Sequence, residues 1–417
     1  MEVIINAKTK KLVLAASIAA MFGGASVPAL ADELADKLYE KGVLTEEEYN
    51  ELKGSDDDMS GSFKGGLKWK SADGQHEFLV HGRVQLDYRT SDLPESIDDF
   101  DVRRAYLGVK GKFYKDWSYE VTGDWGRPSP RMEYAYLNYK WNDAVQARAG
   151  HFKFPYGFSQ VTSSRFTDFM ERSFTDDYEP GKDTGVMVYG QPKKNVFSYS
   201  LGYANGGGGR QDAPDTETKD IIFRGAVNFA PMINLDDTVL HLGVDYRDGE
   251  FRPDPDDFPT YGGAKFDRTT NGIEGVAAWG PFKLQSEFQT IDLSTDDSDF
   301  PDVDVYYVNA MWMITGERYA KSYSIDGMKS IKPLKSLSAG GMGAWEVGVQ
   351  FANLDADQST DGELNLDSTT LGVKWIPEEN VRFLLNWVEN DFETPITVNG
   401  QSVDKETQVN LRAQIYF

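Results

Sequence analysis

The chain has 417 residues, no cysteine, and 67 acidic against 43 basic side chains, which gives a net charge of −24. Aromatic residues make up 13% of the chain, and 40 residues are glycine. Many Tyr, Phe and Gly residues without long apolar runs favour strands over helices, and the lack of cysteine excludes a disulfide framework.

The first 31 residues are typical of a secretory signal peptide. Lysines at positions 8, 10 and 11 precede an apolar core over residues 12–25, and the Ala-Leu-Ala sequence at 29–31 fits a cleavage site. The apolar core is short for a membrane anchor, and after residue 31 no segment reaches the roughly 18–20 apolar residues of a membrane helix. The sequence therefore predicts export, with a mature chain that begins near Asp32.

Residues 32–60 are predicted to form a short helical periplasmic leader followed by an acidic linker. One helical run ends at Gly42, and Thr45 with Glu48 fits the capping box that begins a second. Three consecutive aspartates at 56–58 mark the linker. The leader is either a tether or oligomerisation element, or a simple spacer.

From residue 61 to residue 417 the apolar pattern has a period of two, which is typical of strands. In the segment 78–89, for example, Phe78, Val80, Val84 and Leu86 alternate with polar residues. The predicted strands are 78–89, 104–113, 117–125, 134–141, 145–152, 184–190, 197–203, 221–229, 239–247, 272–279, 282–290, 305–314, 344–351, 369–375, 381–388 and 408–417. A short extra strand near 63–69 precedes these sixteen.

The links between strands alternate in length. Short links at 114–116 and 280–281 alternate with longer polar ones such as 154–183 and 204–220, whereas 315–343 is long at a position where a short turn is expected. The last strand is amphipathic and ends on Phe417, which resembles the signal that barrel-assembly machinery recognises. These features predict a 16-stranded antiparallel transmembrane β-barrel of a Gram-negative outer membrane.

Several motifs, in their order along the chain, resemble the phosphate-selective porin O and P family. The motifs are Gly82–Tyr88 (GRVQLDY), Val102–Gly111 (VRRAYLGVKG), Asp116–Tyr119 (DWSY), His151–Gly157 (HFKFPYG), Phe169–Ser173 (FMERS), Asp183–Val186 (DTGV), Ile314–Tyr319 (ITGERY) and Thr370–Trp375 (TLGVKW). The resemblance covers roughly 78–417. It implies a trimeric, sixteen-stranded barrel with loops folded into the pore, and basic pore-lining residues that bind phosphate-like solutes in the anion-selective members.

The charges on the polar, lumen-facing side of the predicted strands give a second indication of anion preference. Thirteen of these residues are basic, namely Arg83, Arg89, Arg104, Lys110, Lys112, Lys140, Arg148, Arg224, Arg247, Lys283, Lys374, Arg382 and Arg412. Seven are acidic, namely Asp87, Glu120, Asp124, Asp245, Glu274, Glu287 and Glu346. A basic lumen concentrates anions, although the same charges can instead be cross-strand pairs that only solvate the wall.

Two long segments are candidates for the constriction. The outer loop 154–183 carries three bases together with Phe166, Phe169, Met170 and Phe174, which we expect to pack the loop against the barrel wall. The segment 315–343 carries five bases and two acids, and it either folds into the pore or remains a loose loop. The candidate pore-lining and anion-binding residues are Arg83, Arg104, Lys110, Lys112, Arg148, Arg165, Arg172, Arg224, Arg318 and Lys321.

The sequence thus favours a passive porin for small hydrophilic solutes, with a preference for anions such as phosphate. The alternative is a barrel that serves as an interaction or structural element, for instance a sheath around a redox partner or an adhesin. No histidine cluster or Ser/His/acid spacing indicates an enzyme, a metal site or a cofactor. The expected partners are outer-membrane lipid, lipopolysaccharide, small anions and two further copies of the chain, with no nucleic acid.

Overall fold

The computed structural model describes residues 37–43, 45, 49, 60–62, 66–127, 129–178, 181–206, 219–251, 266–295, 298–299, 302–356 and 364–417. The chain divides into two compact units, residues 1–79 and 80–417. No helix within the described ranges is long and apolar enough to cross a membrane.

The first unit contains a short hairpin in which β1 (Ser60–Ser62) pairs antiparallel with β2 (Leu67–Lys70). The predicted extra strand near 63–69 therefore corresponds to β2. Residues 37–40 form one helical turn, and the rings of Tyr39 and Tyr49 stack with their centres 4.3 Å apart. Most of the predicted helical leader at 32–53, and all of the predicted signal peptide at 1–31, lie outside the described residues.

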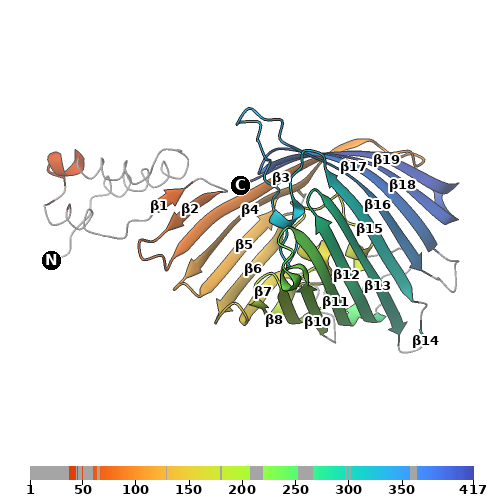
Figure 1. Ribbon diagram of the computed structural model, residues 1–417, viewed down its shortest axis with the longest axis horizontal. Coiled ribbons are helices and arrows are strands. Elements are labelled where there is room, and N and C mark those ends of the chain that lie inside the picture. The colour runs from red at the N-terminus through yellow and green to blue at the C-terminus, as the bar shows by residue number, and fades with distance from the viewer. Residues whose placement is uncertain are drawn as a thin grey trace. The chain divides into compact units, whose positions relative to one another are not determined.

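The second unit is a closed, antiparallel, sixteen-stranded β-barrel, as the alternating pattern predicts (Figure 1). Its strands are β3 (Glu77–Ser91), β4 (Asp99–Phe113), β5 (Trp117–Asp124), β6 (Arg131–Lys140), β7 (Gln146–Lys153), β8 (Lys182–Lys193), β9 (Phe197–Ala204), β10 (Asp220–Asn228), β11 (Thr238–Phe251), β12 (Phe266–Trp279), β13 (Phe282–Thr295), β15 (Val303–Met313), β16 (Ala344–Ala356), β17 (Leu364–Glu378), β18 (Val381–Val398) and β19 (Gln401–Tyr416). The short β14 (Ser298–Asp299) pairs with the end of β13.

The last strand closes the barrel onto the first strand of the cylinder. The pairing of β19 with β3 runs from Gln408 opposite Ser91 to Tyr416 opposite Arg83, and the backbones of Phe417 and Gly82 exchange two hydrogen bonds of 3.0 and 3.1 Å. A Cβ atom on Gly82 would lie 2.5 Å from the ring of Phe417. Only glycine at this position lets the terminal ring lie directly against the β3 backbone.

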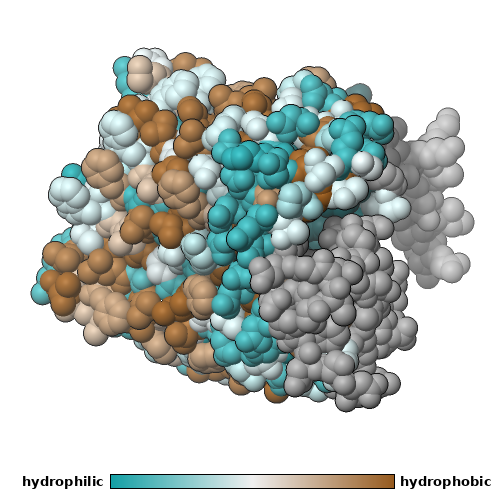
Figure 2. Space-filling model, turned by 90° about the vertical axis from the view of Figure 1, so that its right-hand side faces the viewer, coloured by the Kyte–Doolittle hydropathy of each residue, from teal (hydrophilic) through white to brown (hydrophobic). Residues whose placement is uncertain are grey.

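Side chains alternate between the lumen and the outer surface along each strand. On β10, Ile221 and Phe223 are exposed on the outside, whereas Ile222 and Arg224 are buried inside. On the face shown in Figure 2, hydrophobic side chains gather over a broad area that is bordered by a band of hydrophilic ones. This arrangement suits a barrel whose outer wall contacts lipid.

Two ends of the barrel differ in their connections. Links at 114–116, 194–196, 280–281 and 379–380 are short and define the turn end, and the opposite end is the loop end. Exposed tryptophans lie beside the turn end, namely Trp117, Trp141, Trp279 and Trp312. Such an aromatic girdle marks the boundary between lipid and water.

Several strands extend further at the loop end than the sequence predicts. Strand β18 continues to Val398 instead of 388, and β12 begins at Phe266 instead of 272. The added residues are largely polar on both faces, so they lack the apolar alternation that identifies a strand.

Two segments fold into the barrel from its opposite ends. The inner loop, residues 154–181, joins β7 to β8 and contains α4 (Phe158–Val161) and α5 (Thr175–Tyr178). The turn-end segment, residues 314–343, joins β15 to β16 and contains the 3-10 helix η3 (Tyr319–Lys321). A further 3-10 helix, η1 (Ala230–Ile233), lies in the link between β10 and β11.

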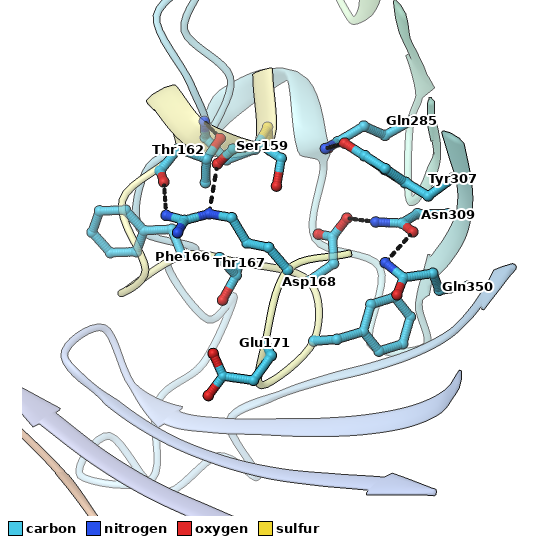
Figure 3. A pocket seen from close by; sticks show the side chains of 13 residues that line it. Ser159, Thr162, Phe166, Thr167, Asp168, Glu171, Gln285, Tyr307, Asn309 and Gln350 are labelled. Carbon is cyan, nitrogen blue, oxygen red and sulfur yellow. Dashed lines mark hydrogen bonds between the residues drawn. The ribbon is translucent and has the colours of Figure 1, made fainter. Parts of the chain in front are cut away.

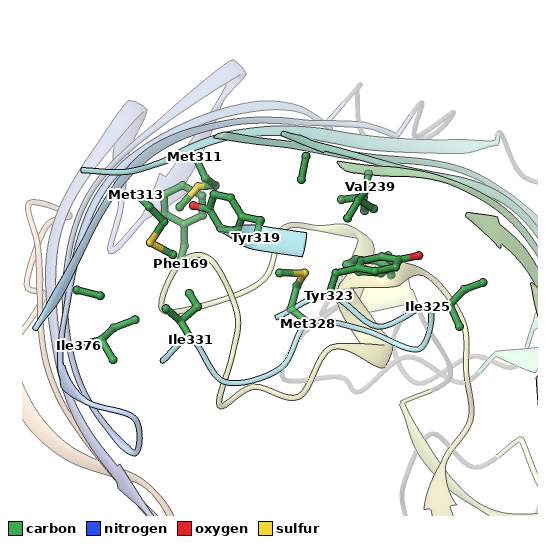
Figure 4. Packing of buried hydrophobic residues seen from close by; sticks show 14 of the residues in the cluster. Phe169, Val239, Met311, Met313, Tyr319, Tyr323, Ile325, Met328, Ile331 and Ile376 are labelled. Carbon is green, nitrogen blue, oxygen red and sulfur yellow. The ribbon is translucent and has the colours of Figure 1, made fainter. Parts of the chain in front are cut away.

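The two inward segments share one hydrophobic cluster with the barrel wall (Figure 4). From the inner loop, Phe158 and Phe169 enter it, and from the turn-end segment Tyr323, Ile325 and Met328 do so. The expected packing of the aromatic residues of the inner loop is therefore confirmed. The turn-end segment folds into the lumen, so the alternative of a loose loop is wrong.

Candidate functional site

The inner loop is fixed to the barrel wall by carboxylates and an amide of the strands. The backbone N–H of Gly157 donates to Asp245 Oδ1 at 2.9 Å, and that of Ser159 donates to Glu287 Oε1 at 2.5 Å. Further along, the N–H of Met170 donates to Asn386 Oδ1 at 2.7 Å. The loop backbone therefore has a defined position in the lumen, which a loop in water would lack.

Asp168 of the inner loop points back to the wall. Asn309 Nδ2 donates to its Oδ2 at 3.0 Å (Figure 3), and Lys283 Nζ donates to its Oδ1 at 2.6 Å. Burial alone would raise the pKa of Asp168, but the ammonium groups of Lys283 and Lys374 hold that pKa below its usual value. Asp168 is therefore a charged anchor of the loop.

The turn-end segment is held just as firmly, by contacts to distant parts of the chain. The backbone N–H of Met328 donates to Thr162 Oγ1 at 3.0 Å, which joins the segment directly to the inner loop. The hydroxyl of Tyr323 lies 2.7 Å from Nδ1 of the buried His241 on β11. The hydroxyl of Tyr416 donates to Ser330 Oγ at 2.8 Å.

A small cavity of about 20 Å³ lies between the inner loop and the wall, lined by residues that include Asp168, Glu171, Asn309 and Gln350 (Figure 3). A cavity needs about 10–15 Å³ to hold one water molecule. This cavity therefore has room for about one water molecule, and a solute must pass elsewhere.

Most buried bases of the lumen are neutralised by a neighbouring acid. Eight lysine and arginine residues are buried in the part of the chain that the structure describes. Six of them pair with carboxylates, as Arg224 with Glu274, Arg247 with Asp220, Arg268 with Asp220, Lys283 with Asp168, Lys374 with Glu346, and Arg412 with Asp87. Five of these pairs join two strands, as the interpretation of cross-strand pairs requires, and the sixth joins Lys283 of the wall to Asp168 of the inner loop.

The two exceptions, Arg83 on β3 and Arg382 on β18, lie beside Arg165 of the inner loop. Arg83 Nη1 donates to the hydroxyl of Ser164 at 2.8 Å, and the guanidinium groups of Arg165 and Arg382 lie 5.4 and 5.1 Å from the ring centre of Phe166. We call Arg83, Arg165 and Arg382 the arginine site.

No carboxylate among the described residues forms an ion pair with any member of the arginine site. The Nε atom of Arg83, and Nε and Nη2 of Arg382, are buried without a hydrogen-bond partner within the described ranges. Buried charges without a partner are costly, and each such donor lacks the acceptor that a native interior normally supplies. The arginine site is therefore a concentration of positive charge and hydrogen-bond donors suited to an anion.

A second group of arginines lies toward the loop end, and we call it the outer arginine group. It comprises Arg89 on β3, Arg103 and Arg104 on β4, and Arg412 on β19. Gln85 connects it to the arginine site, because Gln85 Oε1 accepts from Arg104 Nη1 at 3.0 Å while its Nε2 donates to the carbonyl of Ser164. The two groups therefore adjoin on the wall.

The wall continues toward the turn end with bases that lie on aromatic rings. The guanidinium of Arg148 lies 4.2 Å from the ring centre of Tyr136, and its Nη2 donates to the hydroxyl of Tyr189 at 2.9 Å. Lys110 is half-buried and Lys112 is exposed near the end of β4. Arg148, Lys110 and Lys112 therefore place bases on β4 and β7 between the arginine site and the turn end.

The structure separates the ten predicted site residues into groups. It brings Arg83, Arg104 and Arg165 together, and it places Arg148, Lys110 and Lys112 further along the same wall. It does not bring the remaining four to this site. They are Arg172, bonded to the Ser159 and Thr162 carbonyls and Asp176; Arg224, paired with Glu274; Arg318, exposed and paired with Asp237; and Lys321, exposed on the turn-end segment.

Sequence reasoning missed Arg103 and did not select Arg382 as a site residue. Arg103 belongs by alternation to the outward face, yet its Nε lies 3.3 Å from Glu171 inside the barrel. The predicted strand begins at residue 104, whereas β4 begins at Asp99, so Arg103 lies outside the segment to which the alternation is applied. Arg382 has the inward parity, but its lack of an acidic partner depends on the three-dimensional register.

The sequence is similar to those of known outer-membrane porins. The profile of the family described as phosphate-selective porin O and P matches residues 78–417. Porin O of Pseudomonas aeruginosa is 27% identical over 395 residues, which cover 81% of this chain and 88% of that protein. The match thus includes the whole barrel.

Solved structures show the same fold at lower identity. An anion-selective porin from Comamonas acidovorans superimposes with a TM-score of 0.57 at 16% identity, over 82% of this chain and 100% of that one. The trimer form of OmpT from Vibrio cholerae gives a TM-score of 0.54 at 12% identity, over 82% and 99% of the two chains.

Proposed function

Because this chain belongs to the phosphate-selective porin O and P family, we propose that it is an anion-preferring channel for small oxyanions such as phosphate. Membership of the family places it in the outer membrane of a Gram-negative bacterium, as a channel rather than an enzyme. The preference for anions and the identity of the solute are the parts we propose.

The arginine site carries this proposal. Arg83 and Arg382 are buried without a carboxylate partner in the described chain, whereas the six other buried bases each have one. If Arg83 and Arg382 only stabilised the wall, we would expect each to have a carboxylate partner too, because an unpaired buried charge costs folding free energy. Arg165 is only half-buried, so a solute anion that contacts it can serve as the counterion of the whole arginine site.

The positions of the bases support a path along the wall of β3, β4 and β7. An anion entering from the loop end meets the outer arginine group, then Arg165 of the arginine site, and then Arg148 and Lys110. Arginine suits each step, since its planar fork offers paired hydrogen bonds to phosphate oxygens. Neighbouring stations allow an anion to move on without losing all its partners at once.

The alternative of a sheath around a redox partner or an adhesin requires a wide lumen. The inner loop and the turn-end segment meet inside the barrel and share a hydrophobic cluster. A protein partner inside the lumen would have to displace that cluster. We therefore favour the channel.

We further propose that the channel is a homotrimer in contact with outer-membrane lipid and lipopolysaccharide. The trimer form of OmpT from Vibrio cholerae, which has a similar fold, supports this assembly. Cross-linking of the purified protein in detergent tests it.

The test of anion binding compares the arginine site with an exposed arginine of the same chain. Chloride current through the purified channel in a planar bilayer is titrated with inorganic phosphate, for the wild type, the double variant R83Q/R382Q and the control R318Q. Removing two charges should raise the half-blocking phosphate concentration by about tenfold or more, since hydrogen bonds to charged groups are worth about 1.5–3 kcal/mol each.

R318Q should stay within about twofold of the wild type, because Arg318 is exposed to solvent and paired with Asp237 at the turn end. Equal block of the wild type and R83Q/R382Q would show that the arginine site does not bind the solute.

A further inference from the structure

Glu171 of the inner loop lies among the outer arginine group. Its Oε1 accepts hydrogen bonds from Arg89 Nη2 at 2.5 Å, from Arg412 Nη2 at 2.8 Å and from Arg103 Nε at 3.3 Å. The side chain is 41% exposed, so it faces open space in the lumen and is not enclosed by the wall. Figure 3 shows it pointing away from the other labelled side chains.

The other acid in this group, Asp87, is already committed to the wall. Asp87 is fully buried and accepts two hydrogen bonds from Arg412, each of 2.6 Å, and one from Arg89 of 2.8 Å. Arg103 has no other ion pair in the described chain, and Arg104 has none at all. The carboxylate of Glu171 is therefore the exposed counterion of the group.

A carboxylate presents the same chemistry to a guanidinium as a phosphate does, namely oxygen atoms that accept charge-assisted hydrogen bonds. Glu171 thus occupies donors that a passing oxyanion would otherwise use. Within the described residues the arginine site forms no ion pair with such a carboxylate, and the two adjoining groups of arginines differ in this respect.

We infer that Glu171 is a built-in competitor of the solute, which weakens oxyanion binding at the outer arginine group and thereby sets the affinity of the channel. A channel conducts only when its sites bind strongly enough to admit the ion and weakly enough to release it. With Glu171 in place, the outer group attracts an oxyanion but does not hold it. This inference rests on the proposed function.

The test is the phosphate block of chloride current in Glu171→Gln. Glutamine keeps the size of the side chain and removes its charge. The half-blocking phosphate concentration should fall about tenfold, because one opposing charge within hydrogen-bond distance of three guanidinium groups is lost. Glu171→Asp, which retains the carboxylate, should stay within about threefold of the wild type.

Asp176→Asn is the matched control. Asp176 lies on the same loop, and it pairs with Arg172, which is not a member of the outer arginine group. The same loss of one negative charge should change the phosphate block by less than about twofold. An equal effect of both variants would mean that only the total charge of the loop matters, and it would overturn the inference.

A cysteine variant allows the same inserted channel to be recorded before and after a charge is added at position 171. The chain has no cysteine, so Glu171→Cys introduces the only reactive thiol. Reaction with a negatively charged methanethiosulfonate should weaken phosphate block in the inserted channel, and reaction with a neutral one should not. This comparison remains valid even when Glu171→Gln inserts poorly.

The outcomes separate the inference from the proposed function. Wild-type current that phosphate does not block, with no block in Glu171→Gln either, contradicts the proposed function. Block of the wild type together with equal block of Glu171→Gln contradicts the inference alone. Weaker block in Glu171→Gln would mean that the carboxylate positions the arginines for the solute, which also overturns it.

Discussion

At the scale of the residue, arginine has three different roles in the lumen of this barrel. Arg224 and Arg412 are buried and paired with strand carboxylates, so they stabilise the wall. Arg172 donates to carbonyl groups of its own loop and maintains the shape of that loop. Arg165 belongs to a site without a carboxylate partner in the described chain, and it is available to a solute. Partners, and not residue type, decide the role of a lumen arginine.

The ionisation of Glu171 gives a prediction about pH. Burial would raise its pKa, but the guanidinium groups of Arg412, Arg103, Arg104 and Arg89 outweigh burial and hold the pKa well below its usual value of 4.5. A lowered pKa means that the negative charge persists as the pH falls through the usual value, and disappears only below it.

The chloride-to-potassium permeability ratios of the wild type and Glu171→Gln should therefore differ by a constant factor between about pH 8 and pH 5. Reversal potentials recorded across that range in the two channels measure the factor. Convergence of the two channels above about pH 5 would show that the carboxylate is not held ionised by the arginines.

At the scale of the element, contact between the two inward segments determines the shape of the passage. Gly327 has a φ of +103°, and a Cβ atom there would lie 2.7 Å from the backbone nitrogen of Thr162. Gly340 lies on the same segment with a φ of +75°, and a Cβ atom there would meet nothing within 4 Å. Comparing alanine variants of Gly327 and Gly340 therefore separates the strain of a positive φ from the loss of the close contact with Thr162.

Both Gly327→Ala and Gly340→Ala should lose about 1–2 kcal/mol from the left-handed backbone conformation. Only Gly327→Ala should push the turn-end segment away from the inner loop. We expect single Gly327→Ala channels to switch among several conductance levels, while Gly340→Ala channels keep the wild-type level. Identical single-channel records for the two variants would mean that the contact with Thr162 does not shape the passage.

The elements differ in how far the sequence predicts them. Apolar alternation identifies all sixteen strands, and it locates their turn ends within three residues because the lipid-facing stripe begins there. It stops short at the loop end, as on β18, where both faces meet water. The direction of the turn-end segment is not predictable from its charge, since its inward packing depends on apolar residues such as Ile325 that meet partners far along the chain.

The sequence predicts which arginines of the candidate site face the lumen, but it does not predict which of them pair with an acid. Strand parity correctly predicts that Arg83, Arg104 and Arg382 face the lumen, because the alternation of side chains is a local property of the sequence. Ion pairing is not local, since Lys374 pairs with Glu346 on the neighbouring strand β16, whereas Arg382 forms no ion pair in the described chain. Glu171 could not be assigned to the outer arginine group without the path of the inner loop.

At the scale of the whole molecule, the net charge and the local charge of the passage have opposite signs. The chain carries a net charge of −24, yet inside the barrel the three bases of the arginine site form no ion pair within the described residues. Screening limits the reach of acidic surface residues to about 8 Å at physiological salt. The selectivity of the channel should therefore follow its lumen and not its total charge.

The most direct test of this account is the reversal potential of the wild-type channel in a planar bilayer across a potassium chloride gradient. We predict a potential shifted toward the equilibrium potential of chloride, because the arginine site and the bases beside it admit anions. A potential shifted toward that of potassium would contradict the account, since it would mean that the acidic residues of the chain govern what passes.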